Sequence, residues 1–253
     1  MRPLFSVATI ALLAALVRVA AQAQEAPIEE ARRILDTADR DPPAIDRARD
    51  LLEASMSGSG AEGADPAIVT ELSRIWYLFG ELRTPAGEAS IAAFDRGRTL
   101  GEVAVRRAPK DANAHLWYAI NLGRWAEERG ILRSILELST VKREVAEMLR
   151  LAPDLPDAHV FAGGLARNLP GFLGGDQSRA EEHYRRAVAL DPHRTRFHLE
   201  LAELLIEAER LDEARGELRQ VLAEAAPSDR VFTALYDRPR AKKRLAELDA
   251  AAQ

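Results

Sequence analysis

One stretch, Asp176 to Pro192, constrains the fold of this chain most, because it has the marks of a complete helix with a defined start and end. Asp176 follows two glycines and can cap the first free N–H groups, while Pro192 cannot continue a helix. Between them, Ala180, Tyr184 and Ala187 recur at helical spacing on one face. A large ring between two small residues lets neighbouring helices approach closely. The chain must therefore bury this face against other helices.

The composition favours helices throughout. The chain has 253 residues, 47% of them hydrophobic and 30% charged, and the β-branched and aromatic residues that favour strands are sparse. We therefore predict an all-α protein with a sizeable core. The formal net charge is −5 with both signs interleaved, which does not fit a nucleic-acid partner.

The helix-forming segments pair into about five hairpins, which we predict to form one solenoid domain over residues 24–253. Prolines end successive hairpins at positions 109, 153, 192 and 227, and the clearest repeats are 157–192 and 194–227. Ala180 and Ala214 are 34 residues apart, whereas the spacings between the terminating prolines are longer. We interpret the excess as insertions, mostly between the two helices of each hairpin.

This pattern resembles the tetratricopeptide (TPR) family. The alanine, aromatic, alanine and proline at positions 180, 184, 187 and 192 match the second helix of a TPR unit, and 34 residues is the TPR period. The resemblance implies a right-handed superhelix of helical hairpins that acts as a binding scaffold. We therefore expect a protein partner, no catalytic activity and no cofactor.

A narrower resemblance concerns the middle of the chain, which is similar to the TPR component associated with TRAP-type transporters (TatT-like). This resemblance implies a solenoid perforated by a ligand pore, with a periplasmic solute-binding protein as partner. Eukaryotic regulators of microtubule dynamics share a similar helical array, but the expected export of this chain argues against a shared role. The residues that carry the resemblance are Gly97, Gly101, Pro109, Trp117, Tyr118, Ala119, Pro170, Leu173, Gly174, Gly175 and Asp176.

The first residues predict a cleaved signal peptide over 1–23. Arg2 precedes an apolar run from Leu4 to Val17, and Ala21-Gln22-Ala23 has the A-x-A form that a signal peptidase favours. The run is short for a membrane span, although an uncleaved anchor is the alternative interpretation. The chain has no cysteine, so it has neither a lipidated cysteine nor a disulfide. We therefore expect the mature chain in the periplasm or secreted.

No motif for catalysis or metal binding is present in the sequence. Signatures of serine hydrolases, zinc proteases, phosphate-binding loops and EF-hands are absent. None of the five histidines forms an i, i+4 pair on a helix, so we expect no metal site. Glycine costs helix stability, and Gly163-Gly164 inside a predicted helix therefore indicates close packing of a neighbouring helix.

Side chains on the first helices of the hairpins are the candidate partner or ligand contacts. Trp117 and Tyr118 point about 100° apart on a helix, and Trp125 lies on nearly the same face as Trp117. In one interpretation the two tryptophans are core and Tyr118 packs at its margin; in the other, one of the three lines a concave pocket. His159 and Glu203 fall where a TPR unit faces its groove, although His159 also fits an ordinary polar surface position.

Two further segments carry unusual side chains. Loop 168–175 contains Leu169, Phe172 and Leu173, which either fold back to plug the end of the solenoid or form an apolar contact surface or pore lip, with Phe172 as a candidate contact. The basic segment 238–244 forms either the solvated face of a terminal capping helix or a docking site for an acidic partner or anionic lipid head groups.

Two functions are open on these grounds. The first is an exported, non-catalytic scaffold for protein–protein interaction. The alternative is a binder of a small apolar or amphipathic solute that serves as accessory of a TRAP-type transporter. A closed cavity lined by aromatic side chains near Trp117 and Phe172 would favour the solute, and an open polar groove would favour the scaffold.

Overall fold

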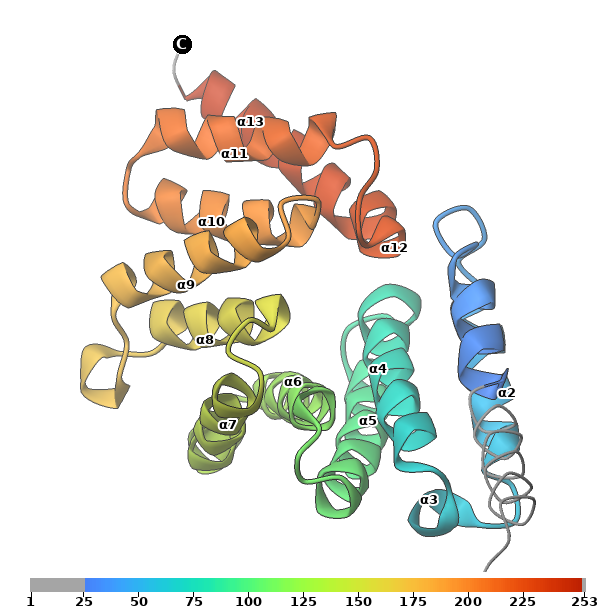
Figure 1. Ribbon diagram of the computed structural model, residues 1–253. Helices are drawn as coiled ribbons and strands as arrows, with labels where there is room; N and C mark the ends of the chain where they lie inside the picture. Colours follow the sequence, from blue (N-terminus) through green and yellow to red (C-terminus); the bar gives the residue numbers. More distant parts are fainter. Residues whose placement is uncertain (1–25, 252–253) are drawn as a thin grey trace, which may run out of the picture.

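The computed structural model describes residues 26–251, and every regular element in that range is helical (Figure 1). The predicted signal peptide lies outside the described residues. Within them, no helix combines the length and apolar character needed to cross a membrane. The elements are a first helix over residues 26–35, then α2 (Ala44–Ser55), α3 (Gly60–Gly63), α4 (Pro66–Arg83), α5 (Glu88–Arg107), α6 (Ala112–Glu128), α7 (Ile131–Leu151), α8 (Pro156–Asn168), η1 (Gly171–Leu173), α9 (Gln177–Leu190), α10 (Thr195–Glu207), α11 (Leu211–Ala223), α12 (Arg230–Phe232), η2 (Thr233–Asp237) and α13 (Arg238–Ala250).

The long helices pair into the five hairpins that the sequence predicts. The first helix and α2 share one hydrophobic cluster, and the later pairs are α4 with α5, α6 with α7, α8 with α9 and α10 with α11 (Figure 1). Aspartates start three of these helices as expected: Asp65 accepts from the Ala67 amide at 2.8 Å, Asp111 does the same for α6, and Asp176 caps α9. The predicted all-α solenoid is confirmed.

The extra residues beyond the 34-residue period lie in the helices themselves, so the interpretation of insertions between helices was wrong for most of the chain. The second helices α5 and α7 have 20 and 21 residues, against 14 in α9 and 13 in α11. Longer helices continue the same hydrogen-bond ladder and expose no additional backbone groups. Only the hairpin of α8 and α9 carries its excess in a loop, which contains η1.

The core is a series of clusters between neighbouring helices. Ala180, Tyr184 and Ala187 are almost completely buried, which confirms the packing face of α9. Gly163 of α8 lies directly under the Tyr184 ring, and a Cβ at this glycine would come within 2.7 Å of it. The prediction that this glycine permits close helix packing is therefore confirmed.

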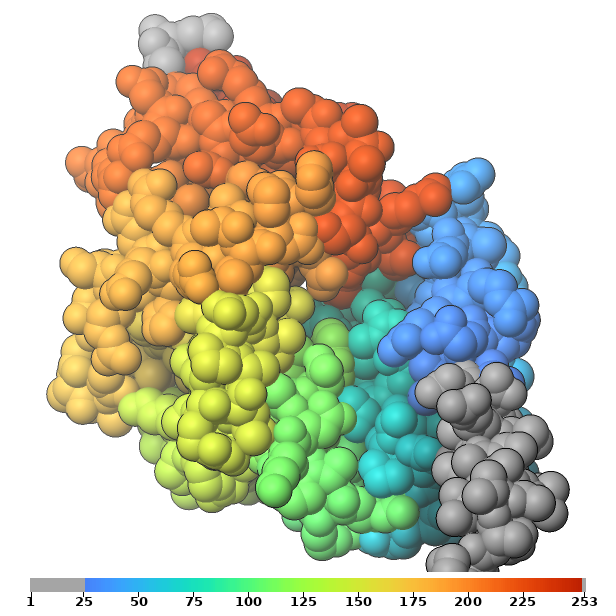
Figure 2. Space-filling view, viewed as in Figure 1, coloured from blue at the N-terminus to red at the C-terminus, as the bar shows by residue number. Residues whose placement is uncertain are grey.

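The two ends of the solenoid meet, so that the array closes into a ring. Arg230 of α12 pairs with Asp39, which follows the first helix, at 2.8 Å although 191 residues separate them. The Phe232 ring packs 5.8 Å from Tyr77 of α4, and Phe232 belongs to the hydrophobic cluster of the N-terminal helices. Figure 2 shows the C-terminal and N-terminal segments in contact on the molecular surface. Closure places the first helices of the hairpins around a common centre.

The C-terminal helix α13 covers the last hairpin, as a terminal capping helix would. Its Ala241 and Leu248 are buried against Leu199, Leu218 and Val221 of α10 and α11. The chain reaches α13 through η2, a five-residue π-helical segment. Part of the basic segment 238–244 is used inside the fold, because two of its arginines pair with a buried carboxylate of α10.

Candidate functional site: the central cavity

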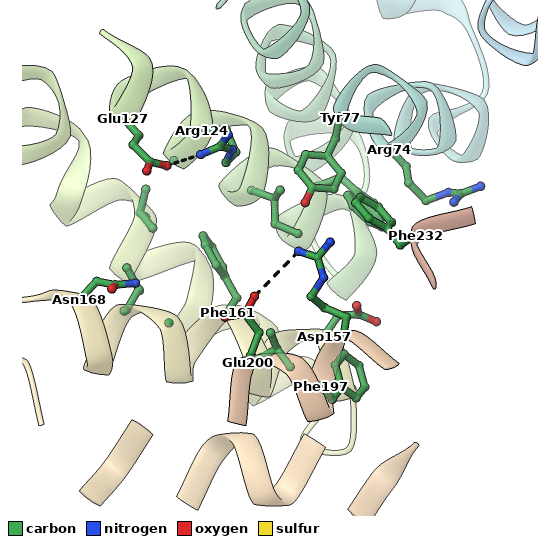
Figure 3. A pocket seen from close by; sticks show the side chains of 18 of the residues that line it. Arg74, Tyr77, Arg124, Glu127, Asp157, Phe161, Asn168, Phe197, Glu200 and Phe232 are labelled. Atoms are coloured by element: carbon green, nitrogen blue, oxygen red, sulfur yellow. Dashed lines mark hydrogen bonds and ion pairs between the residues drawn. The ribbon is translucent and has the colours of Figure 1, made fainter. Parts of the chain in front are cut away.

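A cavity of about 1310 Å³ lies at the centre of the ring. Its wall is formed mainly by the first helices of the hairpins, namely residues 26–35, α4, α6, α8 and α10. The start of α7, loop 169–173 and segment 227–232 complete it. Figure 3 shows side chains from several of these helices converging on the same space. The cavity exists because the solenoid closes, since segment 227–232 supplies the wall between its two ends.

One side of the cavity is apolar. It is lined mostly by aliphatic and aromatic side chains from α6, the start of α7, α8 and loop 169–173, and its charged side chains are Arg124 and Glu127 of α6 and Glu137 of α7. Among them, Trp117 and Phe161 are partly buried, whereas Phe172 is 87% exposed at the edge. Ile131 and Ile135 also line the cavity while remaining largely exposed, so the apolar surface continues from the interior onto the rim.

Tyr77 lies where the apolar and charged sides meet. Its ring lies 5.8 Å from Trp117, 5.8 Å from Phe232 and 6.3 Å from Phe94. Burial raises the pKa of the Tyr77 hydroxyl above its usual value. The hydroxyl is therefore neutral at physiological pH and can act as a hydrogen-bond donor at the centre of the site.

The opposite side of the cavity carries charged groups. Arg194 bridges two carboxylates, with Nη2 at 3.4 Å from Asp157 and 3.2 Å from Asp229. Arg196 pairs with Asp237 at 2.8 Å. The Glu200 carboxylate also lines this side (Figure 3). A cavity with one apolar and one charged side is suited to an amphipathic ligand.

The structure places the three predicted contacts of α6 in different environments. Trp117 packs partly buried against the core cluster of α6, α7 and α8 and also lines the cavity. Trp125 is buried, with the guanidinium groups of Arg98 and Arg133 at 4.3 and 4.6 Å from its ring, and it does not line the cavity. Tyr118 is half-buried at the margin, where its backbone packs against Gly101 of α5.

Phe172 and its loop lie at the rim of the cavity. Leu169, Phe172 and Leu173 all belong to its lining. Phe172 is too exposed to plug the end of the solenoid, and its position matches the alternative of a lip. The apolar character of this loop is thus explained by its place beside the cavity.

His159 lies outside the cavity wall, which agrees with the alternative of a polar position away from the groove. Its Nε2–H donates to the Pro153 carbonyl at 2.8 Å, and its Nδ1 lies 3.1 Å from Nδ1 of His183 on α9. His115 and His198 make the same contact with the carbonyls of Pro109 and Pro192. In each case the histidine follows the terminating proline by six residues, so the side chain joins successive hairpins.

Glu203 is also absent from the cavity wall. It is buried beneath α13, where Arg240 and Arg244 both donate to its Oε1 at 2.9 Å. The expected groove-facing position is covered because α13 packs over this face of α10. The carboxylate therefore fastens the capping helix and is not accessible to a partner.

Several residues of the cavity left no signal in the sequence. Tyr77 and Phe232 come from opposite ends of the ring, and only its closure brings them together. The one available signal was spacing: Asp157 with Phe161, and Phe197 with Glu200, stand four and three residues apart, so each pair shares one face of its helix.

In the described part of the chain, no group of three or more histidine, aspartate or glutamate side chains is placed to hold a metal ion.

The hairpin array and its packing define a TPR-type α-solenoid. A tetratricopeptide-repeat model matches residues 174–236. The thermophilic TPR protein TTC0263 of Thermus thermophilus has a TM-score of 0.65, covering 88% of this chain and 99% of that one. The two sequences are 19% identical, so this likeness concerns the fold alone.

The chain belongs to the family described as regulator of microtubule dynamics protein 1-3, whose model matches residues 28–166, more than half of the sequence. Regulator of microtubule dynamics protein 3 of Bos taurus is 29% identical over 115 residues, which is 46% of this chain and 24% of that protein. Regulator of microtubule dynamics protein 2 of Bos taurus is 34% identical over 67 residues, or 26% of this chain and 16% of that protein. The matches thus span at most about a quarter of these relatives.

Proposed function

We propose that this chain is a non-catalytic binding protein whose central cavity holds a small amphipathic solute and which acts together with a protein partner. The observation that carries the proposal is the closure of the solenoid by Arg230 and Phe232 around a cavity of about 1310 Å³. A TPR fold generally serves as a scaffold for protein interaction. The cavity adds an internal site for a smaller molecule.

The chemistry of the cavity wall supports a solute with an apolar part and a polar part. Apolar side chains of α6, α7 and α8 face one side, and charged side chains of α8, α10 and segment 227–232 face the other. Aromatic side chains such as Trp117 give a large contact area at low cost in conformational entropy. The volume exceeds the roughly 300–1,000 Å³ of typical small-molecule pockets, which suits a ligand with an extended tail.

The family match supports the same site. Residues 28–166 include most of the first helix, α4, α6, α7 and most of α8, which supply much of the cavity wall. The part of the chain that resembles its relatives therefore supplies one part of the wall, and α10, loop 169–173 and segment 227–232 supply the rest. The names of those relatives make microtubule regulation a second candidate function, and cosedimentation with microtubules tests it. Pelleting of this chain with microtubules would favour that function over solute binding.

For the partner, we propose contact at the rim of the cavity. Ile131, Leu132, Ile135 and Leu136 at the start of α7 are 52–76% exposed, and Ile131 and Ile135 line the same cavity as Phe172, which is 87% exposed. Exposed apolar side chains gathered in one place typically mark a contact site. A partner that covers this rim would also control access to the cavity.

We further propose that the chain is exported to the periplasm and that its partner is a solute-binding protein of a TRAP-type transporter. The apolar run from Leu4 to Val17 and the A-x-A site support export. Fractionation followed by N-terminal sequencing tests it. A mature form that begins after Ala23 in the periplasmic fraction supports export, and an intact N-terminus in the cytoplasm contradicts it.

Native mass spectrometry of protein purified gently from its own source is the test of the cavity. We expect a small amphipathic molecule to be retained at one copy per chain.

A substitution at a glycine of the wall tests the site directly. Gly123 of α6 faces Phe161, and an added Cβ would be 3.7 Å from the ring, an ordinary contact. Gly123→Leu would fold and extend its side chain into the cavity, and it should lose the ligand.

The matched control is Gly216 of α11, which has open space around it and lies outside the cavity. Gly216→Leu makes the same chemical change and gains the same helix propensity of up to about 1 kcal/mol. It should retain the ligand at the level of the unmodified protein. Equal retention by both variants, or no retained small molecule in any sample, would contradict a solute site in the cavity.

A further inference from the structure

Most arginines of the cavity wall are closely paired, whereas some of its carboxylates are not. This difference bears on the kind of solute that the site accepts. Four of the arginines that line the cavity contact carboxylates behind the wall. Arg74 pairs with Glu71 at 2.6 Å, and Arg196 with Asp237 at 2.8 Å. The other two pairs are Arg124 with Glu81 and Arg230 with Asp39. None of these four carboxylates belongs to the lining, so these positive charges are largely neutralised from outside the cavity.

Two carboxylates on the charged side of the lining are left with long contacts only, as is Glu137 of α7, which lies 3.4 Å from Arg133. Glu200 lies 3.5 Å from Arg167 and 3.9 Å from Arg196, and Arg167 makes its short contact of 2.6 Å with Glu207. Asp157 lies 3.4 Å from Arg194, which it shares with a second carboxylate. Burial raises the pKa of both Asp157 and Glu200, as expected for carboxylates that their partners neutralise incompletely.

Aromatic rings lie beside these carboxylates. Phe161 follows Asp157 by one helical turn on α8, and Phe197 precedes Glu200 by one turn on α10, so each carboxylate shares its helix face with a ring. Figure 3 shows Glu200 next to Phe161, with Tyr77 and Phe232 facing them and the Arg74 guanidinium pointing away. Carboxylates beside aromatic faces are the groups that attract an organic cation.

We propose that the charged side of the cavity binds a cationic head group, so that the solute is an ammonium amphiphile whose apolar tail lies against α6 and α7. This inference rests on the proposed function of the cavity and specifies its ligand class. The ammonium group lies between Asp157 and Glu200 and against the Phe161 ring. Binding supplies the charge that the wall lacks and leaves the tail in the apolar half.

Two lining arginines, Arg32 and Arg230, are 54% and 52% exposed, but each already pairs with a carboxylate, Glu29 at 3.1 Å and Asp39 at 2.8 Å. The two buried nitrogens of the wall that lack a hydrogen-bond partner within the described chain offer no site for an anion either. Nε of Arg194 and Nη2 of Arg196 have no hydrogen-bond partner among the described residues, but both atoms are fully buried. The side chains of Asp157 and Glu200, in contrast, keep 31% and 27% of their surface exposed. A molecule in the cavity can therefore reach the carboxylates and cannot reach these nitrogens.

The test compares three eight-carbon amphiphiles by isothermal titration calorimetry on the full mature chain: octyltrimethylammonium, octanoate and octanol. We expect the ammonium compound to bind at least about tenfold more tightly than the other two, because Coulomb attraction to a carboxylate and a desolvated contact with the Phe161 ring each contribute on the order of that factor without an N–H donor. Glu200→Gln and Asp157→Asn should each lower the affinity for octyltrimethylammonium about tenfold and leave that for octanol unchanged.

Glu102→Gln on α5 is the matched control, because it removes one exposed carboxylate outside the cavity. It should leave the affinity for all three compounds unchanged, and thermal melting establishes that each variant is folded. Equal or tighter binding of octanoate, or unchanged ammonium affinity in both Glu200→Gln and Asp157→Asn, would overturn the cationic head group while the cavity function stands. Failure of all three compounds to bind would instead refute the proposed function itself. The mass of the ligand retained in native spectra distinguishes a free amine from a lipid with an ammonium head.

Discussion

Two adjacent glycines of α8 give opposite expected responses to the same substitution. A Cβ added at Gly163 would lie 2.7 and 2.8 Å from Cε1 and Cδ1 of Tyr184, whereas one added at Gly164 would lie 3.7 Å from the Tyr184 hydroxyl. Carbon atoms in contact are normally about 3.5–4.0 Å apart. Gly163→Ala therefore forces the Tyr184 ring or the α8–α9 spacing to shift by about 1 Å, and Gly164→Ala requires no shift.

The magnitudes follow from two opposing effects. Alanine in place of glycine within a helix stabilises the folded chain by up to about 1 kcal/mol at either position. Overpacking at Gly163 costs about 1–3 kcal/mol, since Tyr184 is almost completely buried among Ala180, Leu201 and neighbouring side chains and cannot swing into solvent. Gly163→Ala should thus be neutral to about 2 kcal/mol destabilising, and Gly164→Ala up to about 1 kcal/mol stabilising.

Urea unfolding followed by circular dichroism measures the difference on the three proteins under one set of conditions. The expected order of midpoints is Gly164→Ala, then the unmodified chain, with Gly163→Ala level with it or lowest. The two variants should differ by about 1–3 kcal/mol at similar slope. If Gly163→Ala were as stable as Gly164→Ala, the two helices would not be packed as closely as the structure places them, and the reasoning would fail.

The repeat-level features of the fold could be predicted because they are local. The burial of Ala180, Tyr184 and Ala187 follows from spacing within one helix, and the aspartate caps follow from residue type at helix starts. Helix lengths in the second and third hairpins could not be obtained in the same way, since residue spacing alone does not distinguish a longer helix from an insertion at those points. The terminating prolines mark only the end of each hairpin.

Closure of the ring could not be predicted from the sequence. It depends on the summed rotation of five hairpins, and a small change in the angle of each would separate the ends. The contact between Arg230 and Asp39 leaves no periodic pattern in the sequence. For the same reason, Trp117 and Phe172 could be proposed as site residues from the pattern of their own helix and loop, whereas the contact between Tyr77 and Phe232 could not.

The histidines follow a pattern that is visible in the sequence only when they are compared with one another. His115, His159 and His198 each follow a terminating proline by six residues, and each donates to its carbonyl. Three occurrences at the same offset indicate a structural contact repeated with the hairpins. A functional contact of His159 alone would not explain the other two.

Three further predictions test the packing and the charges outside the cavity. Ala180→Glu places a carboxylate on a completely buried face and should destabilise the chain by about 3 kcal/mol or more in urea unfolding; a change below about 0.5 kcal/mol would mean that the face is misassigned. Glu203→Gln should destabilise by about 1–3 kcal/mol, because the buried carboxylate accepts from two arginines of α13. Burial would raise the pKa of Glu203, but these arginines outweigh it and lower the pKa, so its contribution should be present at neutral pH and lost as the pH falls through the lowered value; an equal acid sensitivity of the variant would refute this. The pKa of His198 shifts in the opposite direction. Burial would lower its pKa, but its contacts with the Glu217 carboxylate and the Pro192 carbonyl outweigh burial and raise the pKa above the usual value near 6.5. The protonated ring is therefore the form that the fold stabilises, so its contribution is complete below about pH 6.5 and disappears as the pH rises through the raised value. Melting temperatures of the unmodified chain and His198→Gln, compared from acid to alkaline pH, should converge as the pH rises, and a gap that stays constant would show that the histidine acts through its shape alone.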